Sequence, residues 1–219
     1  MSTQAIEDYL KTIYKLQNQK GTASTSSLAK RLGLSPASVT GMIKKLSRMK
    51  LVRYERYQGV TLTDAGKKIA LEVIRHHRLV ELYLSETLGV PWDKVHDEAE
   101  KWEHILSEEL EVRIDKLLGY PTSDPHGSPI PTRHGIIPER NIIILSELKE
   151  GQSAIIAEVS DRNPDILRYL GERNLYPQTE IKVIVCEPFD GPITIAVHDT
   201  KCTLGQEVAK CIFVSDVKN

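Results

Sequence analysis

Two short helices joined by a tight glycine turn form the pattern that most restricts how this chain can fold. Apolar residues recur at helical spacing over residues 6–16, and a second, shorter helix is expected over residues 25–32. Gly33 makes the turn that follows. A third helix is expected over residues 35–49, because it begins with serine, a favoured N-cap, and then proline, which suits the first helical position. This order is typical of a helix-turn-helix.

A β-hairpin, or wing, is predicted directly after the third helix. Two short β-patterned runs within residues 51–63 flank Gln58-Gly59, a pair that favours a hairpin turn. Small side chains near the start of the third helix would let it lie deep in a DNA major groove, with basic residues placed for phosphates. The predicted DNA-contacting residues are Ser35, Pro36, Ala37, Ser38, Thr40, Lys44, Lys45 and Arg48 of the helix, and Arg56 of the wing.

The distribution of charge supports a polyanionic partner for the N-terminal third. Residues 1–75 contain 14 Lys or Arg and 5 Asp or Glu, whereas residues 76–219 contain 15 and 25. A basic segment suits DNA, and an acidic one suits cations. The alternative is a winged helix that makes only protein contacts, with its basic residues on a solvated face.

Length and composition indicate more than one domain and no membrane partner. The 219 residues exceed what one small core needs. No apolar run approaches the roughly 18 residues of a membrane span. The N-terminus is polar, unlike a signal peptide, so we expect a cytoplasmic protein.

A stripe of metal-ligand residues is predicted on a helix from about Lys94 to Leu118. Its apolar residues recur at helical spacing and form one face. At about 100° per residue, four residues fall together on the opposite stripe: His96, Glu100, Glu103 and His104. Imidazole and carboxylate groups that converge in this way can bind a divalent metal. The alternative is a charged, solvated face.

Two further groups of residues are candidate ligands. His77 and Glu81 are four residues apart on a long helix predicted over residues 64–84, so they share a face. Spacing alone does not exclude His76 in place of His77. Asp124 and His126, in a linker rich in proline and glycine, can add ligands. The alternative for His77 and Glu81 is an ordinary pair on a solvated surface. The alternative for Asp124 and His126 is an ordinary turn.

The C-terminal third is predicted to form a small five- or six-stranded barrel. β-Patterned runs cover residues 153–159, 180–186 and 192–197, and a short helix is expected over residues 164–170. The fold class is therefore mainly α with small β parts. The expected domains are a winged helix-turn-helix over residues 1–73, a helical domain with its linker over 74–140, and the barrel over 141–219.

The chain resembles the diphtheria-toxin-repressor family of metal-dependent transcriptional regulators, closely over residues 5–140 and loosely beyond. The matching segments are Glu7–Tyr14 (EDYLKTIY), Ser35–Thr40 (SPASVT), Arg75–Leu79 (RHHRL), Val95–His104 (VHDEAEKWEH) and Asp124–Pro131 (DPHGSPIP). The resemblance implies a DNA-binding head, a helical metal-binding and dimerisation domain, and a C-terminal SH3-like domain. It also implies a homodimeric, metal-activated repressor of metal-uptake genes that binds double-stranded operator DNA.

The resemblance further implies two metal sites in each subunit. The primary, activating site would use Asp8, Glu100, Glu103 and His104. The second would use His77, Glu81 and His96. Resemblance to three-domain, manganese-responsive members adds Asp124 and His126 to that site, with Asp161 of the C-terminal domain as a weaker candidate.

Manganese(II) is the expected metal, with iron(II) as the alternative. Iron-responsive members have methionine and cysteine where this chain has Asp8 and Glu100, and hard oxygen ligands favour Mn²⁺ over softer ions. Compact two-domain manganese members have a carboxylate at the position of Lys11. A charged lysine cannot be a ligand, so separated sites fit better than their two-metal cluster.

Two other functions compete with a metal-gated regulator. A metallohydrolase would use carboxylate and histidine sites to activate water. No separate general base or substrate pocket can be named for it, and the basic winged helix would have no use. A winged-helix regulator that needs no metal is the second competitor, and it would bind DNA equally well with and without metal.

Overall fold

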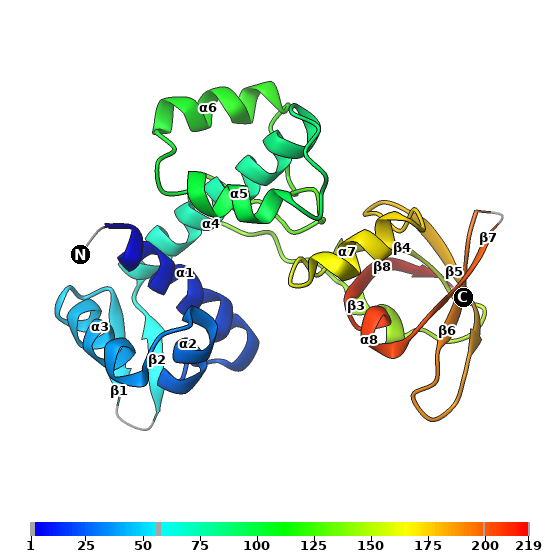
Figure 1. The fold of residues 1–219 in the computed structure, drawn as a ribbon, viewed down its shortest axis with the longest axis horizontal. Coiled ribbons are helices and arrows are strands. Elements are labelled where there is room, and N and C mark those ends of the chain that lie inside the picture. The colour runs from blue at the N-terminus through cyan, green and yellow to red at the C-terminus, as the bar shows by residue number, and fades with distance from the viewer. Residues whose placement is uncertain (1–2, 56–57, 199, 219) are drawn as a thin grey trace. The chain divides into compact units, whose positions relative to one another are not determined.

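The computed structural model describes residues 3–55, 58–198 and 200–218 (Figure 1). The contacts between residues divide the chain into two compact units. The first unit contains the chain up to His77 together with residues 101–111 and 131–136. The second contains residues 78–100, 112–130 and 137–219. This division does not follow the three expected domains, whose boundaries at residues 73 and 140 stay a prediction. Among the described residues, no helix combines the length and apolarity needed to cross a membrane.

Three helices and a hairpin begin the first unit and confirm the expected winged helix-turn-helix. Ser24 and Ser35 cap the second and third helices, accepting hydrogen bonds from the backbone N–H of Ser27 (3.0 Å) and Ser38 (3.2 Å). Gly33 makes the turn between them with φ of 66°, a conformation that glycine adopts at little cost. The elements are α1 (Thr3–Lys20), α2 (Thr25–Leu32), α3 (Pro36–Arg48), and the antiparallel strands β1 (Val52–Glu55) and β2 (Gly59–Leu62).

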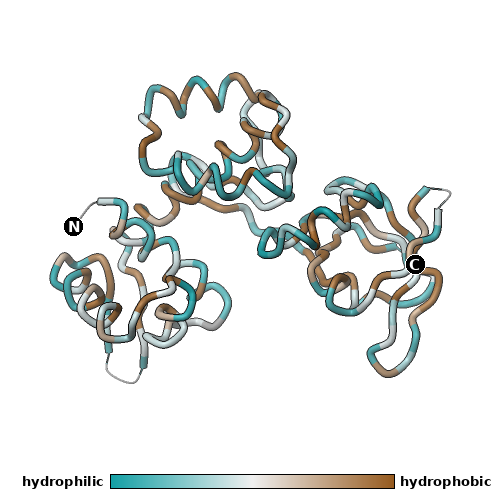
Figure 2. Tube along the Cα trace, in the orientation of Figure 1, coloured by the Kyte–Doolittle hydropathy of each residue, from teal (hydrophilic) through white to brown (hydrophobic). Residues whose placement is uncertain are grey.

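The core of this head is built from one face of each helix. The fully buried side chains include Leu10 and Ile13 of α1, Leu28 of α2, and Ile43 and Leu46 of α3. Hydrophobic and hydrophilic positions alternate along these elements (Figure 2), as expected for amphipathic helices packed on one core. The outer face of α3 is thereby left to solvent.

The single helix expected over residues 94–118 is wrong. The chain forms α5 (Val95–Trp102) and α6 (Glu108–Leu117), with a turn at residues 103–107 between them. Ser107 accepts a hydrogen bond from the N–H of Leu110 (3.3 Å), and acidic residues fill the first turn of α6. Both features favour a new helix start. Glu103 and His104 therefore lie on the turn and not on a helical stripe. The preceding helix, α4, runs over Asp64–Glu86.

The second unit carries a six-stranded antiparallel sheet in the order β3-β8-β4-β5-β6-β7, in agreement with the expected small β-domain. Along β5, Ile181 and Val183 are buried while Glu180 and Lys182 are exposed, which is the alternation expected of a strand with one face on a core. The strands are β3 (Ile143–Ile144), β4 (Ser153–Val159), β5 (Glu180–Cys186), β6 (Ile193–Val197), β7 (Thr200–Leu204) and β8 (Ile212–Lys218), and the helices are η1 (Leu145–Glu147), α7 (Pro164–Gly171) and α8 (Gln206–Ala209).

The linker segment at residues 122–130 is held against strand β4. Asp124 accepts hydrogen bonds from the backbone N–H of His126 and Ser128, both at 2.9 Å, and the carbonyl of His126 accepts from the N–H of Val159 (2.8 Å). Gly127 has φ of 86°, and a Cβ there would lie 2.1 Å from the carbonyl oxygen of Ala157. This close approach fixes the position of Asp124 and His126.

Replacing Gly127 with alanine is expected to destabilise the second unit. The added methyl group meets backbone at a φ that L-residues rarely adopt, so we expect a loss of about 2–4 kcal/mol in the free energy of unfolding. Urea denaturation followed by tryptophan fluorescence measures this loss. Gly205→Ala is the matched control, because a Cβ at Gly205 meets nothing within 4 Å. Equal stability of the two variants would contradict the close approach.

Candidate functional site

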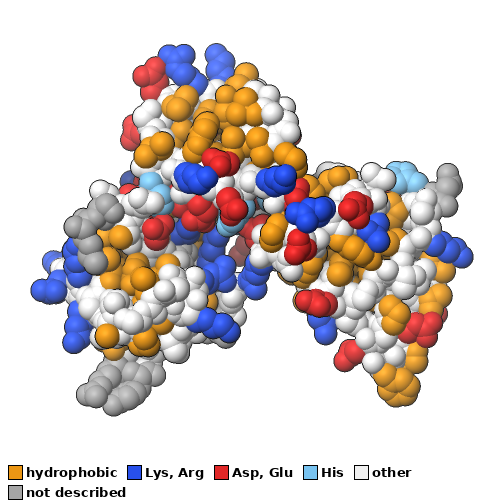
Figure 3. All heavy atoms as spheres, in the orientation of Figure 1, with side chains coloured by type: hydrophobic (Ala, Val, Ile, Leu, Met, Phe, Trp, Pro, Cys, Tyr) orange, Lys and Arg blue, Asp and Glu red, His pale blue; other side chains and the backbone are white. Residues whose placement is uncertain are grey.

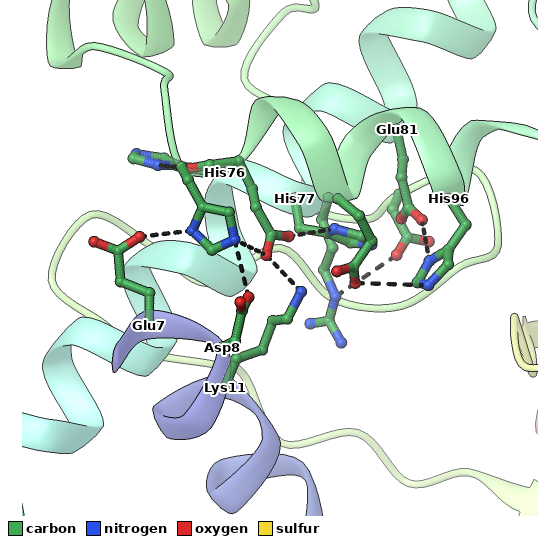
Figure 4. Close-up of polar contacts among 12 residues, drawn as sticks. Glu7, Asp8, Lys11, His76, His77, Glu81 and His96 are labelled. Atoms are coloured by element: carbon green, nitrogen blue, oxygen red, sulfur yellow. Dashed lines mark hydrogen bonds and ion pairs between the residues drawn. The ribbon is translucent and has the colours of Figure 1, made fainter. Parts of the chain in front are cut away.

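A cluster of carboxylates and one imidazole joins α1 to the turn that follows α5 (Figure 4). The ring of His104 lies between two acidic side chains of α1, with Nδ1 2.6 Å from Glu7 Oε2 and Nε2 2.9 Å from Asp8 Oδ1. Nε2 also lies 3.2 Å from Glu103 Oε1. Asp8, Glu103 and His104 thus each place one ligand atom within 4.8 Å of the others. We call this group the α1 cluster.

The donor atoms of the α1 cluster fit a divalent cation. A neutral His104 that donates its Nδ1–H to Glu7 turns the lone pair of Nε2 toward two carboxylate oxygens. This buried Nε2 makes no hydrogen bond. Lone pairs that face one another in a buried site repel, and a cation removes that repulsion. The chemistry of the donors, one nitrogen and carboxylate oxygens, is that of a metal site.

Glu7 is a functional candidate that the sequence analysis did not assign. A carboxylate that accepts from the second ring nitrogen of a metal-binding histidine fixes the tautomer and raises the basicity of the ligand. No spacing rule identifies this role, since Glu7 and Asp8 are helical neighbours about 100° apart. Both reach one imidazole because its ring lies between them.

Glu103 is held from two sides within the same unit. Its Oε1 lies 2.5 Å from the Lys11 ammonium nitrogen, and its Oε2 lies 2.5 Å from Nδ1 of His77 (Figure 4). Glu103 is 1% exposed and Lys11 5% exposed. His77, expected at the second site, thus contacts a residue of the α1 cluster. Glu100 lies on α5 in the second unit, with Oε1 3.7 Å from Nε2 of His96.

A buried ionic network supports the backbone of Glu103. His76 Nδ1 lies 3.1 Å from the carbonyl oxygen of Glu103 and its Nε2 lies 3.4 Å from Glu111 Oε2, while Arg75 Nε donates to Glu111 Oε1 at 2.6 Å. His76 and Arg75 hold the pKa of Glu111 down at about 2, against the opposing effect of burial. Burial lowers the pKa of His76, but its bonds to Glu111 and Glu103 outweigh this and raise it. His76 therefore supports the turn, while His77 reaches the carboxylate.

A second cluster lies within the second unit and contains no sulfur ligand. Glu81, Asp124 and His126 are all buried and place one ligand atom each within 4.8 Å of one another, and Glu81, His96 and Asp161 form an overlapping group. His96 Nδ1 lies 3.2 Å from Glu81 Oε1 (Figure 4). We call these five residues the Glu81 cluster.

His126 presents one nitrogen to the Glu81 cluster. Its Nε2 lies 2.8 Å from the carbonyl oxygen of Trp92, whose ring stacks on the imidazole at 5.6 Å between centroids. A carbonyl only accepts, so Nε2 carries a proton, and in the neutral ring Nδ1 therefore keeps its lone pair. That buried Nδ1 has no hydrogen bond and lies 3.9 Å from Glu81 Oε2. Burial, and then the charge of Glu81, raise the pKa of Asp124 to about 7. Arg78, with Nε 3.6 Å from Asp124 Oδ2, offsets part of this negative charge. Two buried carboxylates beside a ring nitrogen fit a cation site.

The outer face of α3 carries the side chains predicted to contact DNA. Thr40 and Lys45 are half-buried, and Thr40 Oγ1 donates to the carbonyl of Pro36 (2.8 Å). Arg56 lies outside the described residues. Lys and Arg side chains gather on this part of the molecule (Figure 3). The exposed residues of the predicted set are Ser35, Pro36, Ala37, Ser38, Lys44 and Arg48.

Comparisons with known proteins agree with this architecture. Family models match residues 1–60 (iron dependent repressor, N-terminal DNA binding domain), 63–132 (iron dependent repressor, metal binding and dimerisation domain) and 143–216 (FeoA domain). The chain is 38% identical to the diphtheria toxin repressor of Corynebacterium diphtheriae and 32% identical to the iron-dependent repressor IdeR of Mycobacterium tuberculosis, covering 96% of each chain in both pairs. A solved manganese-dependent transcriptional repressor in complex with manganese is 38% identical, with a TM-score of 0.88 over 95% of this chain and 98% of that one.

The chain belongs to the diphtheria-toxin-repressor family of metal-dependent transcriptional repressors. This family consists of repressors and not of enzymes, which removes the metallohydrolase alternative. Relatives named for iron and for manganese both match, so the family alone does not select the metal.

Glu111→Gln tests the network beneath Glu103. Because the pKa of Glu111 is depressed from 4.5 to about 2, its contribution to stability is present above 4.5 and is lost as the pH falls through about 2. Breaking this buried pair should cost about 3 kcal/mol at pH 7, and the difference from wild type should shrink toward pH 2–3.

Urea denaturation at several pH values measures that difference. Glu108→Gln, an exposed neighbour on α6, is the control and should change little. A difference between Glu111→Gln and wild type that stays constant with pH would show that Glu111 is not ionised in the network.

Proposed function

We propose that this chain is a manganese(II)-activated repressor of metal-uptake genes that acts in the cytoplasm as a homodimer on double-stranded operator DNA. The α1 cluster is the activating site, with Asp8, Glu103 and His104 as ligands. The Glu81 cluster is the second site. The observation that carries the proposal is the unsatisfied Nε2 of His104, directed at two carboxylates from two different segments.

The donor sets favour manganese(II) over iron(II). Both clusters offer carboxylate oxygen and imidazole nitrogen, and neither contains methionine or cysteine. Hard oxygen donors suit Mn²⁺, although the intrinsic affinity order places Mn²⁺ below Fe²⁺. Iron(II) is therefore the competing signal, and it must be measured beside manganese.

Activation follows from where the ligands lie. Asp8 belongs to α1 of the DNA-binding head, while Glu103 and His104 belong to the turn after α5. A bound divalent ion supplies the positive charge that offsets the carboxylates. Asp8 and His104 then hold α1 to the turn and fix the orientation of α3. A ligand shifts such an equilibrium only by its preference for one state, and DNA must tighten metal binding by the same factor.

Helix α6 offers an apolar surface for the dimer. Leu110, Val112 and Leu117 of α6 and Ile105 of the preceding turn are large, exposed and apolar. Exposed apolar groups of this size gather where proteins associate, and hydrophobic side chains are prominent over this part of the molecule (Figure 3). In a two-fold dimer the two α3 helices would read half-sites about one helical turn apart.

Fluorescence anisotropy with a palindromic operator of the family type tests the proposal. Chelator-stripped protein is titrated with Mn²⁺, and separately with Fe²⁺ without oxygen, at one fixed salt concentration because salt alone changes such affinities. We expect DNA binding to appear with Mn²⁺ at lower free metal than with Fe²⁺. Binding that is equally tight without metal would leave a metal-independent regulator.

His104→Ala should weaken metal-dependent DNA binding by about a hundredfold, because loss of a ligand removes the link between α1 and the turn. Free Mn²⁺ is held constant in the anisotropy assay. His134→Ala, which changes an exposed histidine, is the matched control and should bind as wild type does. An unchanged response in His104→Ala would remove the α1 cluster as the activating site.

Gly41→Ala should separate stability from DNA binding. Gly41 lies exposed inside α3, and a Cβ there would meet nothing within 4 Å, so packing does not require glycine. Alanine should raise the free energy of unfolding by about 0.5–1 kcal/mol. If the bare position allows close approach to DNA, operator affinity should fall by about tenfold.

Thermal melting and anisotropy measure these two effects. Gln19→Ala, an exposed change on α1, should leave operator affinity unchanged. A Gly41→Ala variant that is more stable and binds as well as wild type would show that DNA does not contact this position.

A further inference from the structure

Lys11 makes a contact that neither DNA binding nor metal ligation explains. It lies on α1, one turn after Glu7 and Asp8, and is 5% exposed. Burying an ammonium group costs free energy unless a counter-charge compensates. Its nitrogen lies 2.5 Å from Glu103 Oε1, whose side chain is fully buried. The structure thus places a positive charge against one carboxylate of the α1 cluster.

The oxygen that Lys11 holds is the one directed into the α1 cluster. Glu103 Oε1 lies 3.2 Å from His104 Nε2, the nitrogen without a hydrogen bond, whereas Oε2 is turned toward His77. The Lys11 ammonium group and the His104 imidazole therefore approach the same oxygen of Glu103. An oxygen bonded to an ammonium group offers less electron density to a second cation, and the two cations repel each other.

We propose that Lys11 is an internal competitor of the metal at the α1 cluster: its ammonium group holds Glu103 Oε1 in the metal-free protein and must give up that oxygen when the ion binds. This inference rests on the proposed function and adds a residue that sets the metal concentration at which the repressor responds. The fixed charge stabilises the metal-free protein and weakens metal binding at the same time.

The two effects distinguish a competitor from a structural support. Removing the charge should destabilise the metal-free protein, because Glu103 is left buried without its counter-charge. It should also tighten Mn²⁺ binding, because a repelling charge and a competing bond both disappear. A lysine that served only to position Glu103 would lower both stability and metal affinity when replaced.

Lys11→Met tests the proposal, since methionine keeps an unbranched side chain without the charge. His126→Ala is introduced in every protein so that the Glu81 cluster does not contribute. Mn²⁺ affinity is measured without DNA, by electron paramagnetic resonance of the free ion. We expect an affinity about tenfold or more above that of the parent, and a melting temperature of the metal-free protein lower by roughly 5–10 °C.

Lys67→Met is the matched control, because it removes an exposed lysine from α4. It should change neither quantity. Lys11→Gln replaces Lys11→Met if the latter does not fold. In the parent protein itself, nitrogen NMR of the lysine ammonium groups should show the Lys11 signal shifting when diamagnetic Zn²⁺ is added, with Lys11→Arg used for assignment.

Three other results would each overturn the inference, and they differ in what they say about the proposed function. Unchanged or weaker Mn²⁺ binding in Lys11→Met, with binding intact in the parent, rejects competition and leaves the proposed function standing. A Lys11 signal that ignores Zn²⁺ under saturating conditions also rejects it. If the parent with His126→Ala binds no Mn²⁺ at all, the α1 cluster is not a metal site, and the proposed activating site fails together with this inference.

Discussion

A buried carboxylate at a break between two helices governs the arrangement of the first unit. Glu103 has almost no contact with solvent, so each of its oxygens needs a partner, and Lys11 and His77 supply them at 2.5 Å. A buried carboxylate without such partners would be very costly. These bonds connect α1, α4 and the turn after α5 at one point. The remaining side chains of the α1 cluster are arranged around that point.

In both clusters a hydrogen bond to one ring nitrogen of a histidine directs the other ring nitrogen toward carboxylates. In each, one ring nitrogen is committed to an acceptor, Glu7 for His104 and the carbonyl of Trp92 for His126. The other nitrogen is buried, makes no hydrogen bond and is turned toward carboxylates. Fixing the tautomer in this way prepares each ring for the ion that the proposed function assigns to the clusters, so that folding of the chain would meet much of the ordering cost of such a site.

The position of the network of Arg75, His76 and Glu111 explains why adjacent histidines have different roles. His76 and His77 differ by about 100° on α4, so one faces the backbone of the turn and Glu111, and the other faces the carboxylate of Glu103. Helix α4 sets the angle between the two histidines, but the location of the turn after α5 decides which histidine contacts which group. The spacing along the chain predicts this angle and does not predict where the turn lies.

Local signals in the sequence were sufficient for the DNA-binding head. Serine caps, Gly33 and the apolar spacing predict α2 and α3, and Gln58-Gly59 between two β-patterned runs predicts the hairpin, because these features act within a few residues. Apolar spacing alone predicted one long helix over residues 94–118, whereas the structure forms two, because Ser107 accepts a hydrogen bond at the start of a new helix.

What the sequence by itself determined is the winged head and the strands of the C-terminal domain, and it supplied the candidate ligands, which contain oxygen and nitrogen but no sulfur. Only the tertiary structure decided that Glu7 orients His104, that Lys11 is paired with Glu103, and that Trp92 fixes the tautomer of His126. The physical reason is distance along the chain. Each of these bonds joins residues that are 34 or more positions apart, and no local periodicity or capping rule reports which distant side chains packing will bring together.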